Sequence, residues 1–440
     1  MKAVCAVLWC LDPVVGAYLV GRYVIKWAEQ HLRGVANATW ARPCSFRVEG
    51  YTRKHKGQVG IYSKVKLSSC IFSGPFENTA PKSYMLALAQ DYSIDMAADI
   101  PIIDAHVHLY PESEIPTIAW CAPEHPLARQ QSVEEYKTAS ASSSPKGFIF
   151  IETDRKNDLD AGVKDGSGWE GPLTEVSWLK RIVTGQPRPD EGHSKEDASL
   201  CAAYIPWAPL PSGPGAMERY IELVKKEAGD SWPKVRGFRY LLQDKPNGTM
   251  LQDDFIESLK LLGRKGLVFE LGVDQHQRGR AQLEEVLEMI DRAHEGVPEG
   301  EKVVLILNHM CKPDLEVYNT HTSTSFIAWR VSMFALSKAS RTYMKLSGGF
   351  SEMPESLKQR TPEEIFEALV PWLTVILTAF GPDRIMFASD WPVCTIGVGD
   401  GAWEKWKKIV ERLCWMASFN DDQQRKIWGG TALEAYGIES

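Results

Sequence analysis

From Ile100 onward, the chain alternates short apolar runs with longer polar or amphipathic stretches. Eight of the apolar runs have the length and composition of buried β-strands. They are Ile102–Leu109, Gly147–Ile151, Cys201–Ile205, Val235–Leu241, Gly266–Leu271, Val303–His309, Thr342–Leu346 and Arg384–Ser389. The repeated alternation of strand-like and helix-like segments predicts a parallel sheet.

Several of the intervening stretches have the pattern of helices. Apolar residues recur at helical spacing in Ala281–His294, an acidic residue is a plausible N-cap of Asp253–Leu262, and Pro362–Phe380 has proline in its first turn. Eight strand–helix units within roughly 290 residues predict an α/β fold, a (β/α)8 TIM-type barrel of ordinary size. A doubly wound open sheet is the alternative. It would usually carry a glycine-rich phosphate-binding sequence after its first strand, where this chain has histidines.

The first 98 residues differ from the rest of the chain. Residues 1–98 show no sustained periodicity, so we expect a disordered or loosely packed extension, followed by the barrel at residues 99–440. Residues 154–200 form a longer connection than the others, between the second and third predicted strands, and contain a predicted helix at Pro172–Val183. In a barrel, such an insertion would overhang one rim, where it would act as a lid.

The charge and the cysteine content of the chain limit the classes of protein to which it can belong. A net charge of −7 and an isoelectric point near 5.9 argue against nucleic acid as a partner and favour a small-molecule substrate. Nine cysteines, without a CxxC pair, indicate reduced thiols and a cytoplasmic protein rather than a secreted disulfide framework. The apolar N-terminal stretch is broken by Asp12-Pro13, which makes it a poor membrane anchor, while a signal peptide stays open. The sequence leaves a homo-oligomer open as well.

The strongest chemical signal is the pair His106 and His108 in the first predicted strand. Side chains two residues apart on a strand point to the same face. Two imidazoles on one face, at the carboxyl end of a barrel strand, can share a metal ion at the place where barrels keep their active sites. The alternative for HxH on its own is a pair of core or surface histidines.

Two further signals lie at the ends of other predicted strands. Asp390 leaves the eighth strand, followed by Trp391 and Pro392, and it can ligate a metal or take a proton from water. His309 ends the sixth strand. Taken singly, Asp390 has a helix-capping role as its alternative, and His309 would be interpreted as a loop residue. Together with the first-strand histidines they converge at one barrel rim, which favours an active site.

Three charged residues belong to the same predicted rim. Arg239, in the fourth strand, can hold a carboxylate, hydroxyls or a developing oxyanion. Glu152 ends the second strand and Glu270 lies late in the fifth, and both can bond to substrate hydroxyls. Structural ion pairs are the alternative for all three. The chain has no GxSxG, HExxH or GxxxxGK[ST] sequence, so serine-nucleophile, zincin and P-loop chemistry find no support.

The order of these motifs resembles the amidohydrolase family, in particular its sugar-lactonase branch. The resemblance covers about Ile102 to Ile438 and rests on IIDAHVHLY, GFRYLLQ, LILNHMCKP, MKLSGGFSE, RIMFASDWPV and RKIWGGTALEAYGI. The insertion sequence PLTEVSWLKRIVTG is similar to fungal L-rhamnono-1,4-lactonases. The resemblance implies a (β/α)8 hydrolase that opens a sugar 1,4- or 1,5-lactone by attack of water.

The resemblance also implies roles for individual residues. His106, His108 and Asp390 would hold one divalent ion, with zinc as the candidate, and Asp390 would be the general base. His309 and Arg239 would stabilise the oxyanion, and Arg239, Glu152, Glu270 and Trp391 would contact the substrate. No lysine ends the second or fourth strand, which argues against a two-metal centre. A metal-independent lactonase, a decarboxylase or hydratase of a related branch, and a catalytically inactive barrel remain alternatives.

Overall fold

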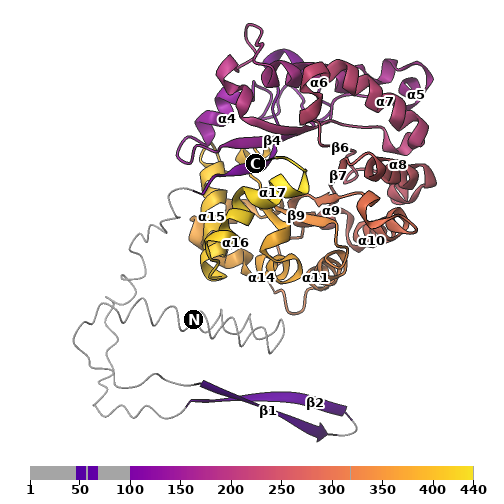
Figure 1. Cartoon of the computed structure of the whole chain (residues 1–440). Helices are drawn as coiled ribbons and strands as arrows, with labels where there is room; N and C mark the ends of the chain where they lie inside the picture. Colours follow the sequence, from indigo (N-terminus) through magenta and orange to yellow (C-terminus); the bar gives the residue numbers. More distant parts are fainter. Residues whose placement is uncertain (1–45, 56–57, 68–99, 318, 440) are drawn as a thin grey trace. The chain divides into compact units, whose positions relative to one another are not determined.

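The computed structural model describes residues 46–55, 58–67, 100–317 and 319–439 (Figure 1). The chain divides into two compact units, Met1–Asp95 and Met96–Ser440. In the first unit, β1 (Phe46–His55) and β2 (Gln58–Leu67) pair antiparallel as a two-stranded sheet. Neither strand was expected from the sequence. The rest of the predicted extension lies outside the described residues.

The second unit is built on eight parallel strands. They are β3 (Ile103–Val107), β4 (Gly147–Ile151), β5 (Cys201–Ile205), β6 (Gly237–Arg239), β7 (Val268–Leu271), β8 (Leu305–Leu307), β9 (Thr342–Leu346) and β10 (Ile385–Phe387). One ladder runs β3-β4-β5 and the other β6-β7-β8-β9-β10. Parallel bridges between Val107 and Trp391 and between Tyr204 and Val235 join their edges, which closes the barrel. This confirms the predicted (β/α)8 fold.

Each barrel strand lies within a predicted apolar run, and three runs match their strands in full: β4, β5 and β9. The other five barrel strands are shorter than their runs, because the hydrogen-bonded ladder begins after the start of the apolar run and, in all but β7, stops before its end. The largest difference concerns His309. It was placed at the end of a strand, whereas β8 ends at Leu307 and His309 begins a separate turn.

Helices form the outer layer of the barrel (Figure 1). The longer ones are α6 (Glu170–Val183), α7 (Gly213–Ala228), α8 (Asp253–Arg264), α10 (Arg280–His294), α11 (Thr324–Leu336), α14 (Pro362–Phe380) and α15 (Ala402–Met416). The shorter ones are α4 (Val133–Ala139), α5 (Leu159–Asp165), α9 (Gln275–Arg278), α12 (Gly349–Glu352), α13 (Glu355–Lys358), α16 (Asp421–Arg425) and α17 (Thr431–Ala435). No helix among these described residues is long and apolar enough to cross a membrane.

Local capping explains where two of the predicted helices begin. Thr361 and Glu364 form a reciprocal capping box ahead of Pro362, so α14 starts where the sequence predicted. For α8 the expected cap was wrong. Gln252 occupies the N-cap position, and Asp253 is the first helical residue, where its charge still favours the helix dipole.

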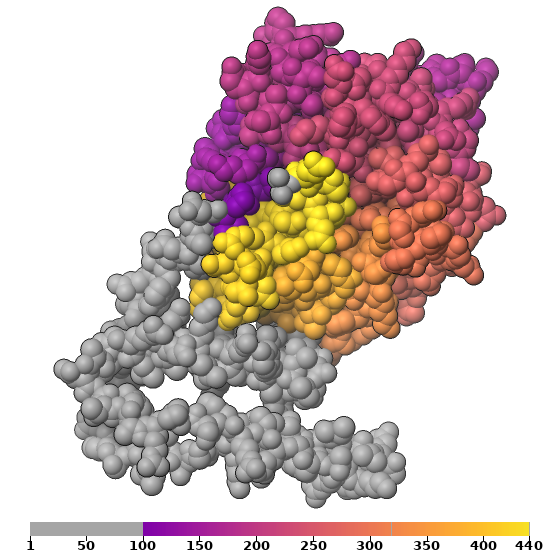
Figure 2. Space-filling view, in the orientation of Figure 1, coloured from indigo at the N-terminus to yellow at the C-terminus, as the bar shows by residue number. Residues whose placement is uncertain are grey.

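The C-terminal segment closes the end of the barrel opposite the pocket described below. Figure 2 shows it beside the first barrel strand, and Gly429 lies against Ile103. Ala432 and Tyr436 are buried in a core cluster with inward-facing residues of several strands, among them Ala105 and Ile306. This plug leaves the carboxyl ends of the strands as the open end of the barrel.

The long connection after β4 carries α5 and α6. The predicted helix Pro172–Val183 lies within α6, which packs against α7 in the outer layer and buries Trp178 and Leu179. The connection contributes Asp154 to the pocket described below. Its predicted role as a lid stays a prediction.

Candidate active site

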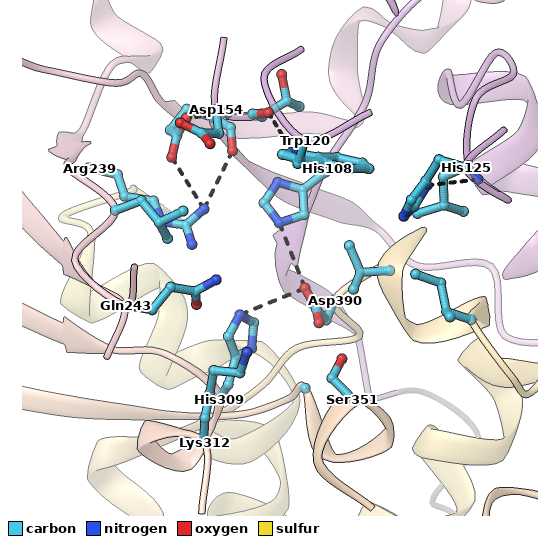
Figure 3. Close-up of a pocket in the computed structure, with 17 residues that line it drawn as sticks. His108, Trp120, His125, Asp154, Arg239, Gln243, His309, Lys312, Ser351 and Asp390 are labelled. Carbon is cyan, nitrogen blue, oxygen red and sulfur yellow. Dashed lines mark hydrogen bonds and ion pairs between the residues drawn. The ribbon is translucent and has the colours of Figure 1, made fainter. Parts of the chain in front are cut away.

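A cavity of about 260 Å³ opens at the carboxyl ends of the strands (Figure 3). Its walls come from the segments that follow most of the eight strands. The lining residues are His108, Trp120, His125, Leu127, Glu152, Thr153, Asp154, Arg239, Leu241, Gln243, His309, Lys312, Gly348, Ser351, Asp390, Val393 and Ile396. This is the end at which (β/α)8 enzymes carry their catalytic groups.

Asp104 holds the first and eighth strands together beneath the cavity. Its buried carboxylate accepts hydrogen bonds from the Ser389 backbone N–H at 2.8 Å, the Trp403 indole at 2.8 Å and the Tyr136 hydroxyl at 3.1 Å. These contacts fix the strand that carries the two histidines against the strand that leads to Asp390.

His106 in β3 and His108, the residue directly after that strand ends, both lie at the barrel centre with their rings together, as their spacing predicted. Their Nε2 atoms lie 3.1 Å apart, and Nδ1 of His108 donates to the carbonyl of Ile151 at 2.9 Å. Burial lowers the pKa of His106 well below its ordinary value, with a further contribution from the charge of Lys345. Burial and the charge of Arg239 lower the pKa of His108 to about 3. Both imidazoles are therefore neutral at pH 7.

His309 reaches the same centre by a strained turn. His309, Met310, Cys311 and Lys312 all have positive φ, between 46° and 58°, a conformation that costs non-glycine residues roughly 1 kcal/mol or more each. Nδ1 of His309 lies 2.9 Å from the Ser347 hydroxyl. Gly348 lies beside the ring: a Cβ there would come within 2.6 Å of Cγ of His309. The strain is offset by surrounding contacts and presents the imidazole to the cavity.

Asp390 lies between the histidines. Its Oδ1 is 3.7 Å from Nε2 of His106, 3.7 Å from Nε2 of His108 and 3.8 Å from Nε2 of His309 (Figure 3). This oxygen is buried and has no hydrogen-bond partner among the described residues. Burial raises the pKa of Asp390 to about 7, against the opposing charges of Lys312 and Arg239. A buried carboxylate oxygen without a partner is an acceptor held ready for a proton or a cation.

Arg239 lies across the cavity from this group. Its guanidinium is 3.3 Å from the carboxylate of Glu152, and its Nε is buried without a hydrogen-bond partner among the described residues. Burial raises the pKa of Glu152 to about 8, while the charge of Arg239 opposes the shift. Both side chains thus border the cavity, as expected, and Arg239 keeps its Nε without a hydrogen-bond partner among the described residues.

Glu270 lies elsewhere than expected. It is fully buried inside the barrel, where both carboxylate oxygens lie 2.9 Å from the Lys345 ammonium and one accepts a short hydrogen bond from the Tyr436 hydroxyl. Trp391 is also absent from the cavity wall, because its ring packs against Tyr136 with centroids 5.6 Å apart. Neither side chain lines the pocket, in contrast to the substrate contacts predicted for them.

Lys345 was not identified from the sequence, yet it touches the histidine centre. Its ammonium lies 3.2 Å from Nδ1 of His106 as well as against Glu270. An ammonium can only donate, so Nδ1 accepts, and the neutral His106 ring carries its hydrogen on Nε2. This hydrogen faces Nε2 of His108, which is free to accept because the other nitrogen of that ring donates to a carbonyl.

The three imidazoles and the Asp390 carboxylate are suitable ligands for one divalent ion, but the four residues are not equally suited to bind it. Zinc with ligands at 2.0–2.2 Å separates tetrahedral ligand atoms by about 3.3 Å, close to the 3.1–3.8 Å found here. His106, His309 and Asp390 also form a group whose ligand atoms all lie within 4.8 Å of one another. His106 is the least suited, because the Lys345 contact places a hydrogen on the nitrogen that would bind.

The fold and this centre of imidazoles and a carboxylate define a barrel hydrolase. The family model described as "Amidohydrolase" matches residues 197–438. An L-rhamnono-gamma-lactonase from Scheffersomyces stipitis is 35% identical over 348 residues, which cover 77% of this chain and 98% of that protein. An L-fucono-1,5-lactonase from Burkholderia multivorans is 29% identical over 247 residues, 55% of this chain and 73% of that protein. The chain belongs to the amidohydrolase family.

A solved structure agrees with this assignment at the level of the fold. An amidohydrolase from Burkholderia multivorans, crystallised with bound zinc, superposes with a TM-score of 0.55 at 24% identity, covering 77% of this chain and all of that one.

Several other polar residues of the pocket, such as Asp154 and Gln243, were not identified from the sequence. They lie in loops after strands, where no periodicity marks the direction of a side chain. Lys312 also lines the pocket, and its one signal in the sequence was the Lys312-Pro313 pair, which begins three residues after His309.

Proposed function

We propose that this protein hydrolyses the 1,4- or 1,5-lactone of a sugar acid, an L-rhamnonolactone-like compound, to the open aldonate. The observation that carries the proposal is the unpartnered Oδ1 of Asp390 beside three neutral imidazoles in an open cavity. The identity of 35% with a rhamnonolactonase, over nearly that whole protein, supports the substrate class.

Asp390 acts as the general base. Its carboxylate takes a proton from water as the water oxygen attacks the lactone carbonyl carbon, and then returns that proton to the ring oxygen when the C–O bond breaks. A base is most effective when its pKa lies near the working pH, and burial brings the pKa of Asp390 to about 7. The product carboxylic acid ionises at neutral pH, so each turnover releases one proton.

Arg239 and His309 stabilise the negative oxygen of the tetrahedral intermediate. Arg239 carries a fixed charge and an unpartnered Nε at the cavity, where little water screens it. Burial, followed by the charge of Arg239, lowers the pKa of His309, so that ring is neutral and serves as a hydrogen-bonding group.

A divalent ion, with zinc as the candidate, would be held by His106, His108 and Asp390. When bound, it would polarise the carbonyl or lower the pKa of water. His106, His309 and Asp390 also have ligand atoms within 4.8 Å of one another, which makes His309 an alternative to His108 in that set. The roles of Asp390, Arg239 and His309 described above hold with or without the ion.

A lactone panel on the purified protein tests the proposal. Proton release from L-rhamnono-1,4-lactone and L-fucono-1,5-lactone, matched by aldonate formation, is expected, and bound metal is measured by elemental analysis on the same sample. Release of carbon dioxide from an unsaturated acid in place of lactone opening would show a decarboxylase. Inactivity on the whole panel would contradict the lactonase assignment.

A further inference from the structure

The left-handed turn at residues 309–312 needs contacts that enforce it. All four residues have positive φ, and non-glycine residues keep such a conformation only where the surrounding structure holds them in it. The turn contributes two side chains to the cavity wall, His309 at its start and Lys312 at its end (Figure 3). The contacts that enforce the turn therefore decide where these two side chains lie.

Two buried carboxylates hold the side chain at the end of the turn. The Lys312 ammonium lies 3.0 Å from Oε1 of Glu352 and 3.3 Å from Oδ2 of Asp274. The side chains of Glu352 and Asp274 are only 4% and 7% exposed, so little water competes for these contacts. Burial alone would lower the pKa of Lys312, but the charges of Glu352 and Asp274 outweigh burial and raise it, so the ammonium stays charged.

The backbone around Lys312 is held by the short helix α9. The His276 backbone N–H donates to the Lys312 carbonyl at 2.9 Å. Just beyond the turn, the Asp314 backbone N–H donates to the Gln275 side-chain oxygen at 3.1 Å. Glu352 joins α9 to the same cluster, because its Oε2 lies 3.0 Å from Nδ1 of His276. One carboxylate thus contacts both the side chain of Lys312 and the helix that holds its backbone.

The segment that runs from the end of β9 through α12 contacts both ends of the turn. At the first end, the Ser347 hydroxyl lies 2.9 Å from Nδ1 of His309, and Gly348 leaves room for that ring. At the other end, Glu352 contacts Lys312. The same piece of chain therefore positions the imidazole and the end of the turn that presents it.

We propose that Glu352 is a positioning residue, which holds the His309 imidazole at the cavity through Lys312 and α9. The proposal rests on the proposed lactonase function, in which His309 stabilises the oxyanion. Glu352 is not among the described residues that line the cavity, so its effect on the reaction passes through the turn. A misplacement of about 1 Å in a group that stabilises the transition state can cost about 10²-fold in rate.

The steady-state kinetics of Glu352→Ala on a lactone that the wild type opens test the proposal. Because an oxyanion-stabilising group acts in the transition state, kcat should fall about 10- to 100-fold while KM stays within about twofold of wild type. Glu352→Gln, which keeps an acceptor oxygen on a side chain of nearly the same shape, should recover part of the loss.

Glu411→Ala is the matched control for these kinetics. Glu411 also pairs with a lysine, Lys407, at 2.6 Å, and the two side chains are 11% and 12% exposed, in the outer helix α15. Its removal breaks a similar ion pair away from the turn, so it should leave kcat and KM unchanged.

Nuclear magnetic resonance of the histidine rings follows the position of His309 without any substrate. In protein made with isotope-labelled histidine, the ring signals of His309 are identified by their loss in His309→Gln. We expect these signals to shift or broaden in Glu352→Ala and to stay in place in Glu411→Ala. A residue that contributed to stability alone would not move them in the folded protein.

The outcomes separate this proposal from the lactonase assignment. Ring signals of His309 that match the wild type in Glu352→Ala would overturn the positioning role, whatever the Tm of the variant. A raised KM at unchanged kcat would overturn it as well. If the wild type opens no lactone in the panel, the lactonase function fails, and the ring signals alone decide whether Glu352 positions His309.

Discussion

Replacing Lys345 with methionine should destabilise the barrel strongly, because it removes the cation from a fully buried ion pair. Both members, Lys345 and Glu270, have side chains with no solvent exposure, and the ammonium contacts both carboxylate oxygens at 2.9 Å. Removing one partner of such a pair costs about 3–5 kcal/mol, since the other charge stays buried without compensation. The remaining hydrogen bond from Tyr436 favours the lower end of that range.

The expected shift in melting temperature follows from the size of the unit. For Met96–Ser440, an unfolding entropy of about 2.1 cal/mol/K per residue amounts to about 0.7 kcal/mol/K. A loss of about 3–5 kcal/mol then lowers Tm by about 4–7 °C. The assay is thermal unfolding followed by tryptophan fluorescence, with urea unfolding as a second measurement.

Two comparisons make the test specific. Lys265→Met breaks an exposed pair with Glu218, whose atoms are 2.8 Å apart, and should change the stability little, because water screens the two charges. The double variant Lys345→Met/Glu270→Gln removes both charges and should recover part of the stability. If Lys345→Met costs no more than Lys265→Met, the assignment of a buried, charged pair is refuted.

Three further predictions concern the site and its surroundings. Gly348→Ala should lower kcat/KM at least about 10-fold, because a Cβ would meet the His309 ring and φ at this position is +66°; wild-type activity in a folded variant would contradict this. The second prediction concerns Glu191. Burial alone would raise the pKa of its carboxyl, but hydrogen bonds from Arg181 outweigh burial and hold that pKa below its ordinary value. The Glu191–Arg181 pair therefore stabilises the fold above the unfolded pKa of Glu191, and this stabilisation is lost as the pH falls through the lowered folded pKa. Glu191→Gln should thus lower the urea midpoint more at pH 7 than at low pH, and an equal effect across the pH range would contradict this. Zinc titration monitored by elemental analysis should reach at most one ion per chain and fall in His108→Ala, whereas unchanged binding in that variant would exclude His108 as a ligand.

The strands were predictable because their apolar runs are continuous and regularly spaced. β4, β5 and β9 match their runs in full, since these strands are mostly or wholly buried. Polar residues flank β4 and β9, and Pro206 follows β5, so the pattern ends there. The convergence of His106, His108 and Asp390 followed from the same pattern, because carboxyl ends of parallel strands meet at one rim.

What the sequence could not supply was the direction of single side chains. Lys345 sits within an otherwise ordinary strand sequence, TYMKL, where nothing indicates that its ammonium is buried. Glu270 was assigned to the rim from its late position in the strand, but its side chain points into the barrel interior toward Lys345. The left-handed turn that presents His309 has no glycine to reveal it.

The central claim is that Asp390, among the histidines, performs the hydrolysis. The most direct measurement is the rate of proton release from a sugar lactone by Asp390→Asn and by wild type, with Tm recorded for both. General-base catalysis accounts for about 10²- to 10⁴-fold, so a loss of that size is expected in a folded variant. Turnover by Asp390→Asn near the wild-type rate would contradict the account.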